Sequence, residues 1–469
     1  MDILLFNPVQ TKNGFALYNF TLLWLASYLK NDGLEARIFF LTHEFEKEIR
    51  DALITYEPRY VAVSCRWYTN LYGAFIVARM VKSYDSNIKV IAGGNTATYF
   101  DKELLSHGDF DIIIRGDAEF PLVQLLKHNR PMNSTIKINN SIKRQEITYI
   151  QSQEELDSYR LECPELIVEN HDRVLKGTNY IWVGKGCKFP CFYCGGSRTA
   201  HIIISGRKDQ ITRPIKNVLS DIKLLTRYSD HIMFDFSDFH SDQKKYFINL
   251  LDQLPQKKYY CKIFYWGMPS SEFLDRVNDV FKRSEVIVDV VTFNEKLRKQ
   301  LSQRTWTKPF VSNEDIERIC EYSLEKGNIE IGLESIAGLP QEKEFNFEET
   351  IQFARNLLQK YICVTHISYW PLSLEPASRI YEEPGIFNFQ NARKTFEDFV
   401  ELTKTAFENN YIYPYMEYHS AAGSELQIVN PYGTCEVGSS EEEVYQQSKT
   451  FYDSVYNELR ANRILFKKV

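Results

Sequence analysis

Short apolar runs alternate with amphipathic stretches along the first quarter of the chain. Five of these runs are typical of buried strands bounded by polar residues or glycine: 2–6, 36–40, 60–65, 89–92 and 111–114. Between the first two, Leu22, Leu25, Ala26 and Leu29 recur at helical spacing, which indicates an amphipathic helix. Strands separated by helices predict a doubly wound, Rossmann-like α/β domain with a parallel sheet over residues 1–127.

A second alternation begins after a polar stretch, 128–170, which we interpret as a linker with a turn signal at Asn139 to Ser141. Six further runs are typical of strands: 180–183, 231–236, 259–266, 285–292, 328–334 and 363–370. A second Rossmann sheet and a barrel both need helical crossovers between parallel strands, such as the periodic stretch 348–358, so only the strand count separates them. Six strands favour a partial (β/α)6 barrel over residues 171–384.

The last segment, 385–469, is mainly helical by its periodicity at 392–407 and 441–459. A tyrosine-rich stretch, 411–418, separates these two helices. We expect the segment to form a lid over the open mouth of the barrel.

Charge and composition exclude several classes of function. The chain carries 56 Lys and Arg against 62 Asp and Glu, a formal charge of −6, and it has no long basic run, which argues against nucleic acid as a ligand. Neither a signal peptide nor an apolar run of roughly 20 residues is present, so we expect a soluble, cytoplasmic protein without a membrane segment. Six of the nine cysteines are scattered singly, which favours reduced thiols over a disulfide framework.

The other three cysteines, Cys187, Cys191 and Cys194, lie in a glycine-rich loop directly after the first barrel strand. A structural zinc site needs four protein ligands, usually from paired CxxC or CxxC with two histidines, and neither pattern occurs here. Three thiolates on a 4Fe–4S cluster leave one iron without a protein ligand. Such an open coordination site lets the metal bind another molecule and act on it. A zinc knuckle that borrows a distant Cys or His, or a rigid loop with incidental thiols, are the alternatives.

A CxxxCxxC loop with an aromatic residue before its last cysteine, at the end of the first strand of a (βα)6 unit, resembles the radical S-adenosylmethionine (SAM) superfamily. The resemblance implies that Cys187, Cys191 and Cys194 bind the cluster and that Tyr193 contacts the adenine of SAM. It further implies that the free iron chelates the amino and carboxylate groups of SAM, and that reduction yields a 5′-deoxyadenosyl radical.

Other stretches carry parts of the same resemblance. The stretch "IGLESIAGLPQE", 331–342, resembles the fifth-strand segment beside the SAM adenine and implies contacts from Gly338 and Pro340, although an ordinary strand-to-helix turn explains it as well. The family's Gly-Gly-Glu after strand two is absent, and Asp235 or Ser237 occupies that place. Thr292 and Arg304 stand where related enzymes contact ribose and carboxylate; a solvated helix face is the alternative for Arg304.

The first domain resembles the cobalamin-binding domain that precedes the barrel in a large radical SAM subgroup, on the segments 6–8, 21–33, 61–65, 91–100 and 112–126. Ligands of open α/β sheets bind at the carboxyl ends of the strands, where seven candidate cobalamin-binding residues fall. These are Asn7, Ser64, Gly93, Gly94, Gly116, Asp117 and Glu119. The Asp-x-His-x-x-Gly signature of other cobalamin proteins is absent, as is common in this subgroup. A purely structural sheet is the alternative; a nucleotide-binding domain is disfavoured because no GxGxxG follows the first strand.

The resemblance therefore implies a cobalamin-dependent radical SAM enzyme that uses a 4Fe–4S cluster, SAM and cobalamin, with an electron donor such as flavodoxin or ferredoxin. We expect a methyltransferase acting on an unactivated carbon of a small-molecule or peptide natural-product intermediate. The alternatives are a rearrangement, cyclisation or oxidation with cobalamin assisting or absent, and a cluster-bearing redox sensor without turnover. The sequence does not identify the catalytic residues. Tyr413 and Cys435 are the candidates, and a role in packing is the simpler interpretation of both.

Overall fold

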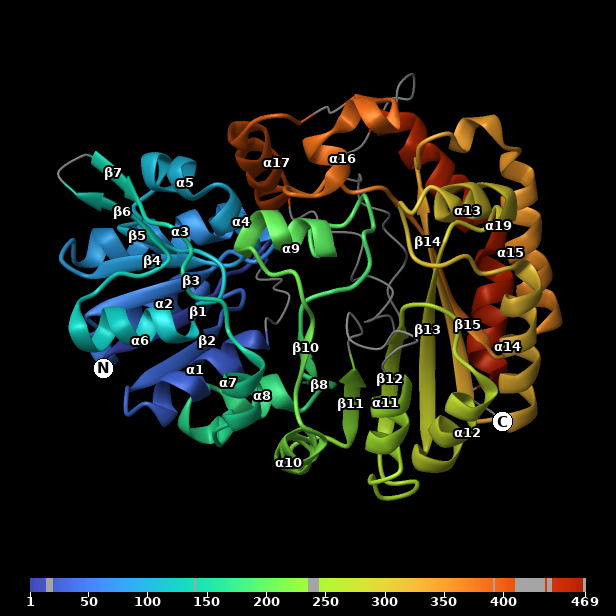
Figure 1. The fold of residues 1–469 in the computed structure, drawn as a ribbon, viewed down its shortest axis with the longest axis horizontal. Coiled ribbons are helices and arrows are strands. Elements are labelled where there is room, and N and C mark those ends of the chain that lie inside the picture. Colours follow the sequence, from blue (N-terminus) through green and yellow to red (C-terminus); the bar gives the residue numbers. More distant parts are fainter. Residues whose placement is uncertain are drawn as a thin grey trace.

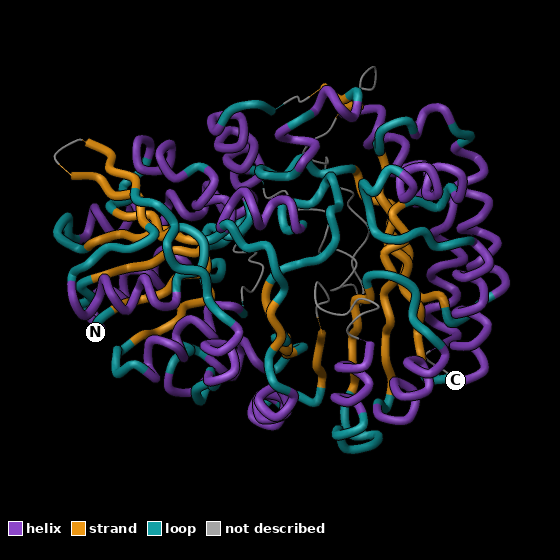
Figure 2. The backbone as a smooth tube through the Cα atoms, viewed as in Figure 1, coloured by secondary structure: helices purple, strands orange, loops and turns teal. Residues whose placement is uncertain are grey.

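The computed structural model describes residues 1–13, 20–138, 141–234, 244–390, 393–409, 435–436 and 441–466. Two α/β bodies lie side by side, the first built on a seven-stranded sheet and the second on a curved six-stranded sheet (Figure 1). The tube view shows helices on both sides of the first sheet but along the outer side of the second (Figure 2).

The first sheet has the doubly wound order β2-β1-β3-β4-β5 in its parallel part. Its strands are β1 (Ile3–Asn7), β2 (Ala36–Phe40), β3 (Tyr60–Ser64), β4 (Lys89–Gly93) and β5 (Ile112–Ile114). Its helices are α1 (Thr21–Asn31), α2 (Phe45–Tyr56), α3 (Leu71–Tyr84), α4 (Asn95–Tyr99), α5 (Asp101–His107) and α6 (Glu119–His128). The order reverses between β1 and β3, the place where such sheets bind ligands.

The segment 128–170 is part of the first body, so the prediction of a linker there is wrong. Strands β6 (Ser134–Ile138) and β7 (Ser141–Arg144) form a hairpin that extends the sheet antiparallel to β5. At the opposite edge, Ile38 N–H donates to Ile167 O at 2.7 Å and Glu169 N–H to Ile38 O at 2.9 Å. Helices α7 (Gln153–Ser158) and α8 (His171–Leu175) follow. The composition is polar because an edge hairpin exposes most of its side chains.

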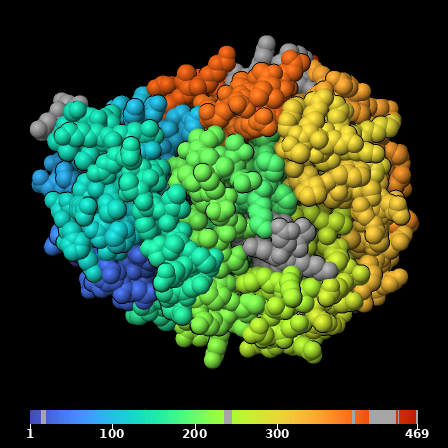
Figure 3. Space-filling view, in the orientation of Figure 1, coloured from blue at the N-terminus to red at the C-terminus, as the bar shows by residue number. Residues whose placement is uncertain are grey.

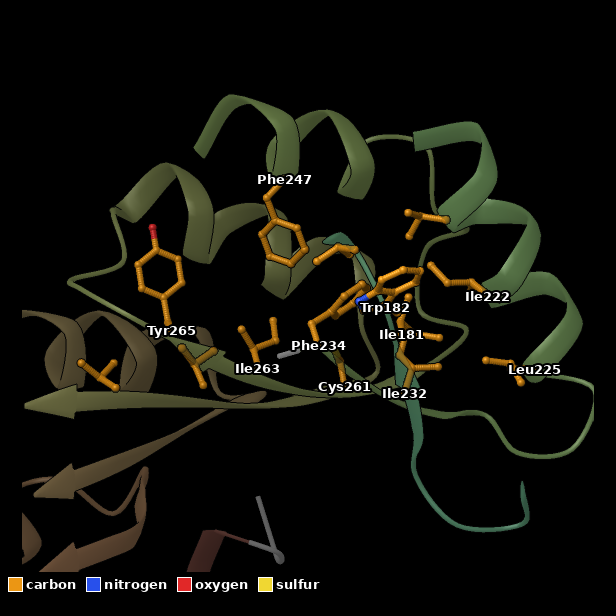
Figure 4. Packing of buried hydrophobic residues seen from close by; sticks show 14 of the residues in the cluster. Ile181, Trp182, Ile222, Leu225, Ile232, Phe234, Phe247, Cys261, Ile263 and Tyr265 are labelled. Atoms are coloured by element: carbon orange, nitrogen blue, oxygen red, sulfur yellow. The ribbon is translucent and has the colours of Figure 1, made fainter. Parts of the chain in front are cut away.

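The second body has six parallel strands in sequence order, which matches the predicted partial barrel. The strands are β8 (Asn179–Ile181), β11 (His231–Phe234), β12 (Tyr260–Tyr265), β13 (Arg283–Val291), β14 (Ile329–Ala337) and β15 (Val364–Pro371). The outer helices are α10 (Ile215–Leu225), α11 (Lys244–Leu251), α12 (Ser271–Val280), α13 (Glu295–Gln303), α14 (Asn313–Lys326) and α15 (Phe347–Lys360). Figure 4 shows Ile181, Ile232 and Ile263 of the strands packed beneath Ile222, Leu225 and Phe247 of α10 and α11.

Several short elements lie outside the two large sheets. They are β9 (Gly184–Lys185), α9 (Arg198–Ser205), β10 (Ile211–Thr212), α16 (Arg379–Glu382), β16 (Phe389–Gln390) and β17 (Cys435–Glu436). In the space-filling view the green surface around residue 200 lies between the blue-to-teal first body and the yellow barrel (Figure 3). None of the described helices is long and apolar enough to cross a bilayer.

The two C-terminal helices pack on different bodies. Helix α17 (Phe396–Glu408) returns to the first body, where the Phe396 and Phe399 rings lie 5.2 and 5.7 Å from that of Phe100. Helix α19 (Glu441–Phe466) packs on β15, and its Tyr452 hydroxyl accepts a hydrogen bond from Tyr369 N–H at 2.7 Å. The predicted helical region is present, but the described helices act as supports for both bodies.

Candidate functional site

The three-cysteine loop runs from β9 to α9 and is held by backbone hydrogen bonds. Cys194 N–H donates to Cys191 O at 3.2 Å, and Ser197 N–H donates to Cys194 O at 3.1 Å. Ser197 also caps α9, because its hydroxyl accepts from Ala200 N–H. Gly195 N–H donates to the Glu375 carboxylate at 2.5 Å, so the segment after the last barrel strand braces the loop after the first.

The surroundings of Cys191 and Cys194 disfavour the ionised form of both thiols. Burial raises the pKa values of Cys191 and Cys194, and for Cys194 the neighbouring charges of Glu375, Cys191 and Cys187 act in the same direction. Three clustered thiolates therefore repel one another unless a metal compensates them. No three His, Cys, Asp or Glu side chains in the described ranges converge on one ion. A four-iron cluster takes one thiolate at each of three irons, so its ligands need not meet at a point, and the donor set fits it.

Tyr193 lies within this loop, between the second and third cysteines. Its ring packs edge-on against Phe192, with the centroids 5.1 Å apart, and burial raises the pKa of its hydroxyl. Phe192 is fixed in turn by two backbone hydrogen bonds, from Phe192 N–H to Trp306 O at 2.8 Å and from Ile380 N–H to Phe192 O at 2.9 Å. The contact of Tyr193 with adenine stays a prediction.

The turn after β14 contains the other two predicted adenine contacts. Gly338 has φ +78°, a conformation that side chains disfavour. Gly338 and Leu339 N–H groups donate to Glu342 at 2.5 and 3.2 Å, and the Tyr369 hydroxyl donates to the other Glu342 oxygen at 2.7 Å. The turn therefore orders itself through Glu342, which the sequence reasoning missed, and the SAM contacts of Gly338 and Pro340 stay predictions.

The remaining barrel candidates are less well placed. Thr292 is buried at the end of β13, where its hydroxyl accepts from Asn294 N–H at 3.2 Å. Arg304 is exposed at the end of α13 and lies over the Trp306 ring at 4.9 Å, which agrees with the solvated alternative. Asp235, Ser237 and Tyr413 lie outside the described residues. Cys435 is placed only by its backbone, which pairs with Gln390 of β16.

A cavity of about 270 Å³ opens at the carboxyl edge of the first sheet. Six of the seven predicted cobalamin-binding residues line it: Ser64, Gly93, Gly94, Gly116, Asp117 and Glu119. Asn7 is buried at the end of β1 and is absent from the lining. Gly94 has φ +113°, and a Cβ there would lie 2.6 Å from Arg66 Cα, so only glycine fits. The barrel body supplies the opposite wall, including Trp182, Lys185, His201 and Arg207.

Ion pairs across the cavity wall join the two bodies. Lys185 Nζ lies 3.0 Å from Asp117 and 2.5 Å from Glu119, and Arg207 lies 2.5 Å from Asp117. Burial alone would raise the pKa of Asp117, but Lys185 and Arg207 lower it to about 2. Burial lowers the pKa of His201 to about 4, so its imidazole is neutral near pH 7. Lys185, His201 and Arg207 were not predicted from the sequence because they belong to no motif. The one feature that could have indicated them is that they lie near the cysteine loop along the chain.

Comparison with known proteins adds independent information. Residues 8–126 match the family model described as the B12 binding domain. Two structures of the radical S-adenosylmethionine methyltransferase TsrM from Kitasatospora setae have the same fold. One, with tryptophan substrate and aza-SAM bound, has a TM-score of 0.65 at 16% identity over 83% of this chain and 78% of that chain. The other, with cobalamin and a 4Fe–4S cluster bound, has a TM-score of 0.63 at 17% identity over 84% and 81%. Residues 8–126 thus match the expected cobalamin-binding domain, and the chain has the fold expected of cobalamin-binding radical SAM enzymes.

A comparison of sequences also finds a curated relative. The ribosomal protein uS12 methylthiotransferase RimO from Protochlamydia amoebophila is 25% identical over 244 residues, which are 49% of this chain and 48% of the relative. The chain thus spans about half the length of that relative. The comparisons show a B12-binding domain over residues 8–126 and, for the chain as a whole, the fold of the TsrM methyltransferase.

Proposed function

We propose that the chain is a cobalamin-dependent radical SAM methyltransferase. The observation that carries the proposal is the contiguity of the cysteine loop and the cavity. A Cβ at Gly196 would lie 3.3 Å from the Trp67 ring of the first body and 3.7 Å from Cys194 Sγ. Trp67 follows Arg66, which lines the cavity. The loop and the cavity therefore meet along one boundary, as two cofactors that act on one substrate require.

The chain would hold its cofactors with two sets of residues. Cys187, Cys191 and Cys194 would bind the cluster, and the cavity at the first sheet would take cobalamin. Cobalamin carries carboxamide side chains, which need both donors and acceptors, and the wall offers Lys185 and Arg207 beside Asp117 and Glu119. When bound, these cofactors supply electron transfer, radical initiation and a methyl carrier.

The role of the protein is to position the substrate and to exclude water. The barrel lumen adjoins the cysteine loop, since the charges of Asp289 and Lys308 act on the Cys191 thiol. Trp24, Tyr180 and Trp182 give the cavity an apolar floor between the two bodies. We infer a small-molecule or peptide natural-product intermediate as substrate, methylated at an unactivated carbon, with electrons from a flavodoxin or a ferredoxin.

The test is reconstitution without oxygen, followed by incubation with hydroxocobalamin and desalting. We expect stoichiometric cobalamin by absorbance, and turnover of SAM to 5′-deoxyadenosine or S-adenosylhomocysteine under reducing conditions. Cys191→Ala should lose the cluster absorbance and keep cobalamin, because the cavity does not contain Cys191. A wild-type protein with an intact cluster that retains no cobalamin would contradict the proposal.

A further inference from the structure

Helix α9, which follows the cysteine loop, presents one of its faces to the cavity between the two bodies. His201, Ile204 and Ser205 all line the cavity. Residues at positions i, i+3 and i+4 of a helix share a face, so these three side chains point the same way. Ile202 and Ile203, which fall between them in sequence, are exposed. The helix therefore directs the His201 side chain into the cavity.

The position of α9 is fixed by close packing. Ala200 and Ile204 are buried in a small cluster with Ala377, which lies after the last barrel strand. On the side of the first body, a Cβ at Gly116 would lie 3.2 Å from Ser205 Cβ, so the helix packs directly on the turn after β5. The backbone that carries His201 is thus held between the two bodies.

The imidazole ring of His201 has no hydrogen-bond partner in the described part of the chain. The hydrogen bonds of the residue are made by its backbone: its N–H donates to Ser197 O at 2.9 Å, and its carbonyl accepts from the Ser205 hydroxyl at 3.0 Å. A neutral imidazole carries one donor nitrogen and one acceptor nitrogen. Both ring nitrogens of His201 are therefore left to a molecule in the cavity.

The surroundings of the ring keep it neutral. Burial lowers the pKa of His201 to about 4, and the charges of Arg207, Arg66 and Lys185 act in the same direction, whereas Asp117 opposes them. A histidine must be neutral to bind a metal ion, because a proton occupies the same lone pair. Near pH 7 the acceptor nitrogen of His201 is thus available without the loss of a proton.

The other polar side chains of the cavity wall differ from His201 in this respect. The ammonium of Lys185 and the guanidinium of Arg207 are protonated and offer no lone pair. Asp117 and Glu119 are already engaged in ion pairs with these two cations. Among the described lining residues, His201 carries the one imidazole, and no thiol or thioether accompanies it. Imidazole nitrogen is a preferred ligand of first-row transition metals.

The first body does not supply an equivalent nitrogen. Residues 7–20, which follow β1, contain no histidine. The described residues of the first sheet that line the cavity contain none either. An imidazole for a metal in this cavity therefore comes from the barrel body, on the helix next to the cysteine loop.

We propose that His201 supplies a ring nitrogen as an axial ligand to the cobalt of cobalamin. The inference rests on the proposed function, since it takes cobalamin as the occupant of the cavity. The ring lone pair forms the coordinate bond, a water molecule leaves that axial position, and neither an electron nor a proton is transferred. Such a bond would connect the barrel directly to a cofactor held at the first sheet.

The experiment uses cobinamide, a form of cobalamin that lacks the nucleotide base, so that an axial nitrogen must come from the protein. The protein is reconstituted without oxygen in a buffer that does not coordinate cobalt, loaded with cobinamide and reduced to cobalt(II) with the cluster left oxidised. Electron paramagnetic resonance then reports the axial ligand. We expect each resolved cobalt line to be split into a triplet by one ordinary nitrogen, and into a doublet when the histidines are labelled with ¹⁵N.

The variants are His201→Gln and, as the matched control, His128→Gln. His128 is exposed and ends α6, the helix whose first residue, Glu119, lines the cavity. We expect the nitrogen splitting to disappear in His201→Gln and to remain in His128→Gln. A normal thermal transition of His201→Gln shows that the loss is not due to misfolding. If that variant releases cobinamide, the labelled wild type decides, because a triplet unaffected by the label excludes histidine.

Two results would overturn the inference while the proposed function stands: bound cobinamide without nitrogen splitting in wild type, or splitting that persists in His201→Gln. In the first case the ring at most hydrogen-bonds a carboxamide of the cofactor. If wild type retains cobalamin but not cobinamide, the same label still separates a doublet from His201 from a triplet caused by the cofactor's own base. A wild-type protein that retains neither compound refutes the proposed function and this inference with it.

Discussion

At the scale of single residues, the cavity depends on carboxylates that are paired across the boundary between the two bodies. Asp117 follows β5 of the first sheet, whereas Lys185 and Arg207 flank the cysteine loop of the barrel. A buried ion pair contributes modestly to stability as a unit, but removal of one partner leaves an uncompensated charge. Substitution of such a residue therefore measures how much the ion pairs between the two bodies contribute to stability.

We expect Asp117→Asn to destabilise the protein by about 2–4 kcal/mol, because Arg207 loses its carboxylate while Lys185 keeps Glu119. Urea unfolding measures this change, and cobalamin retention should fall with it. Asp230→Asn, which removes an exposed pair with Lys282, is the control and should change little. Equal stability of the two variants would show that the boundary does not need Asp117.

The same residue gives a pH dependence with a definite sign. The pKa of Asp117 is lowered from 3.8 to about 2 in the folded protein, so its ionised form stabilises the fold above pH 3.8. That contribution is lost as pH falls from 3.8 towards 2. The difference in unfolding free energy between wild type and Asp117→Asn should therefore shrink across this window in an acid titration, and a constant difference would argue against it.

At the scale of elements, most strands could be predicted because their apolar runs are short and bounded by polar residues. The predicted run 36–40 coincides with β2, and 363–370 is displaced by one residue from β15. The edge hairpin β6–β7 could not be found in this way, since exposed strands lack an apolar face. Periodicity also predicted α17 and α19 but carries no information on which body a helix packs against.

The candidate site was predictable only where a motif fixes spacing. The cysteine loop and the glycines of the first sheet were found because their positions follow strand ends. Lys185 and Arg207 are single charged residues whose importance comes from partners distant in sequence, and a single sequence does not reveal those partners.

The turn after β14 provides an element-scale prediction. Glu342→Ala should release the Gly338 and Leu339 N–H groups and the Tyr369 hydroxyl, at a cost of about 1–3 kcal/mol. If the turn borders SAM, affinity for SAM should also fall, as measured by equilibrium dialysis. Glu344→Ala, on the same short turn and exposed, is the control. Normal stability of Glu342→Ala would mean that the turn holds without its carboxylate.

At the scale of the whole molecule, the chain passes repeatedly between its two bodies. One buried cluster continues from Trp24 of α1 through Trp182 to the barrel helices. Helix α17 inserts Phe396 and Phe399 into the other core of the first body. One core therefore spans both bodies and the second joins the first body to α17, so we expect the two bodies to unfold together.

Phe399→Ala tests this connection, because the residue lies far along the chain from the sheet that it supports. We expect a loss of about 3–5 kcal/mol from the buried ring. Hydrogen exchange should show faster opening in α3, which contacts α17, and in α4, which ends next to Phe100, a residue that contacts Phe399. Effects confined to α17 would mean that the helix is only an appendage.

The hydrogen bond from Gly195 to Glu375 also bears on the order of events during synthesis. The cysteines emerge from the ribosome long before the carboxylate that braces their loop, since 180 residues separate the two partners. A nascent chain therefore displays three thiols on an unfinished loop until most of the barrel has been made. Delivery of iron and sulfur in the cell would then succeed only late in translation or after release, and chains shortened before residue 375 should leave the ribosome without a cluster.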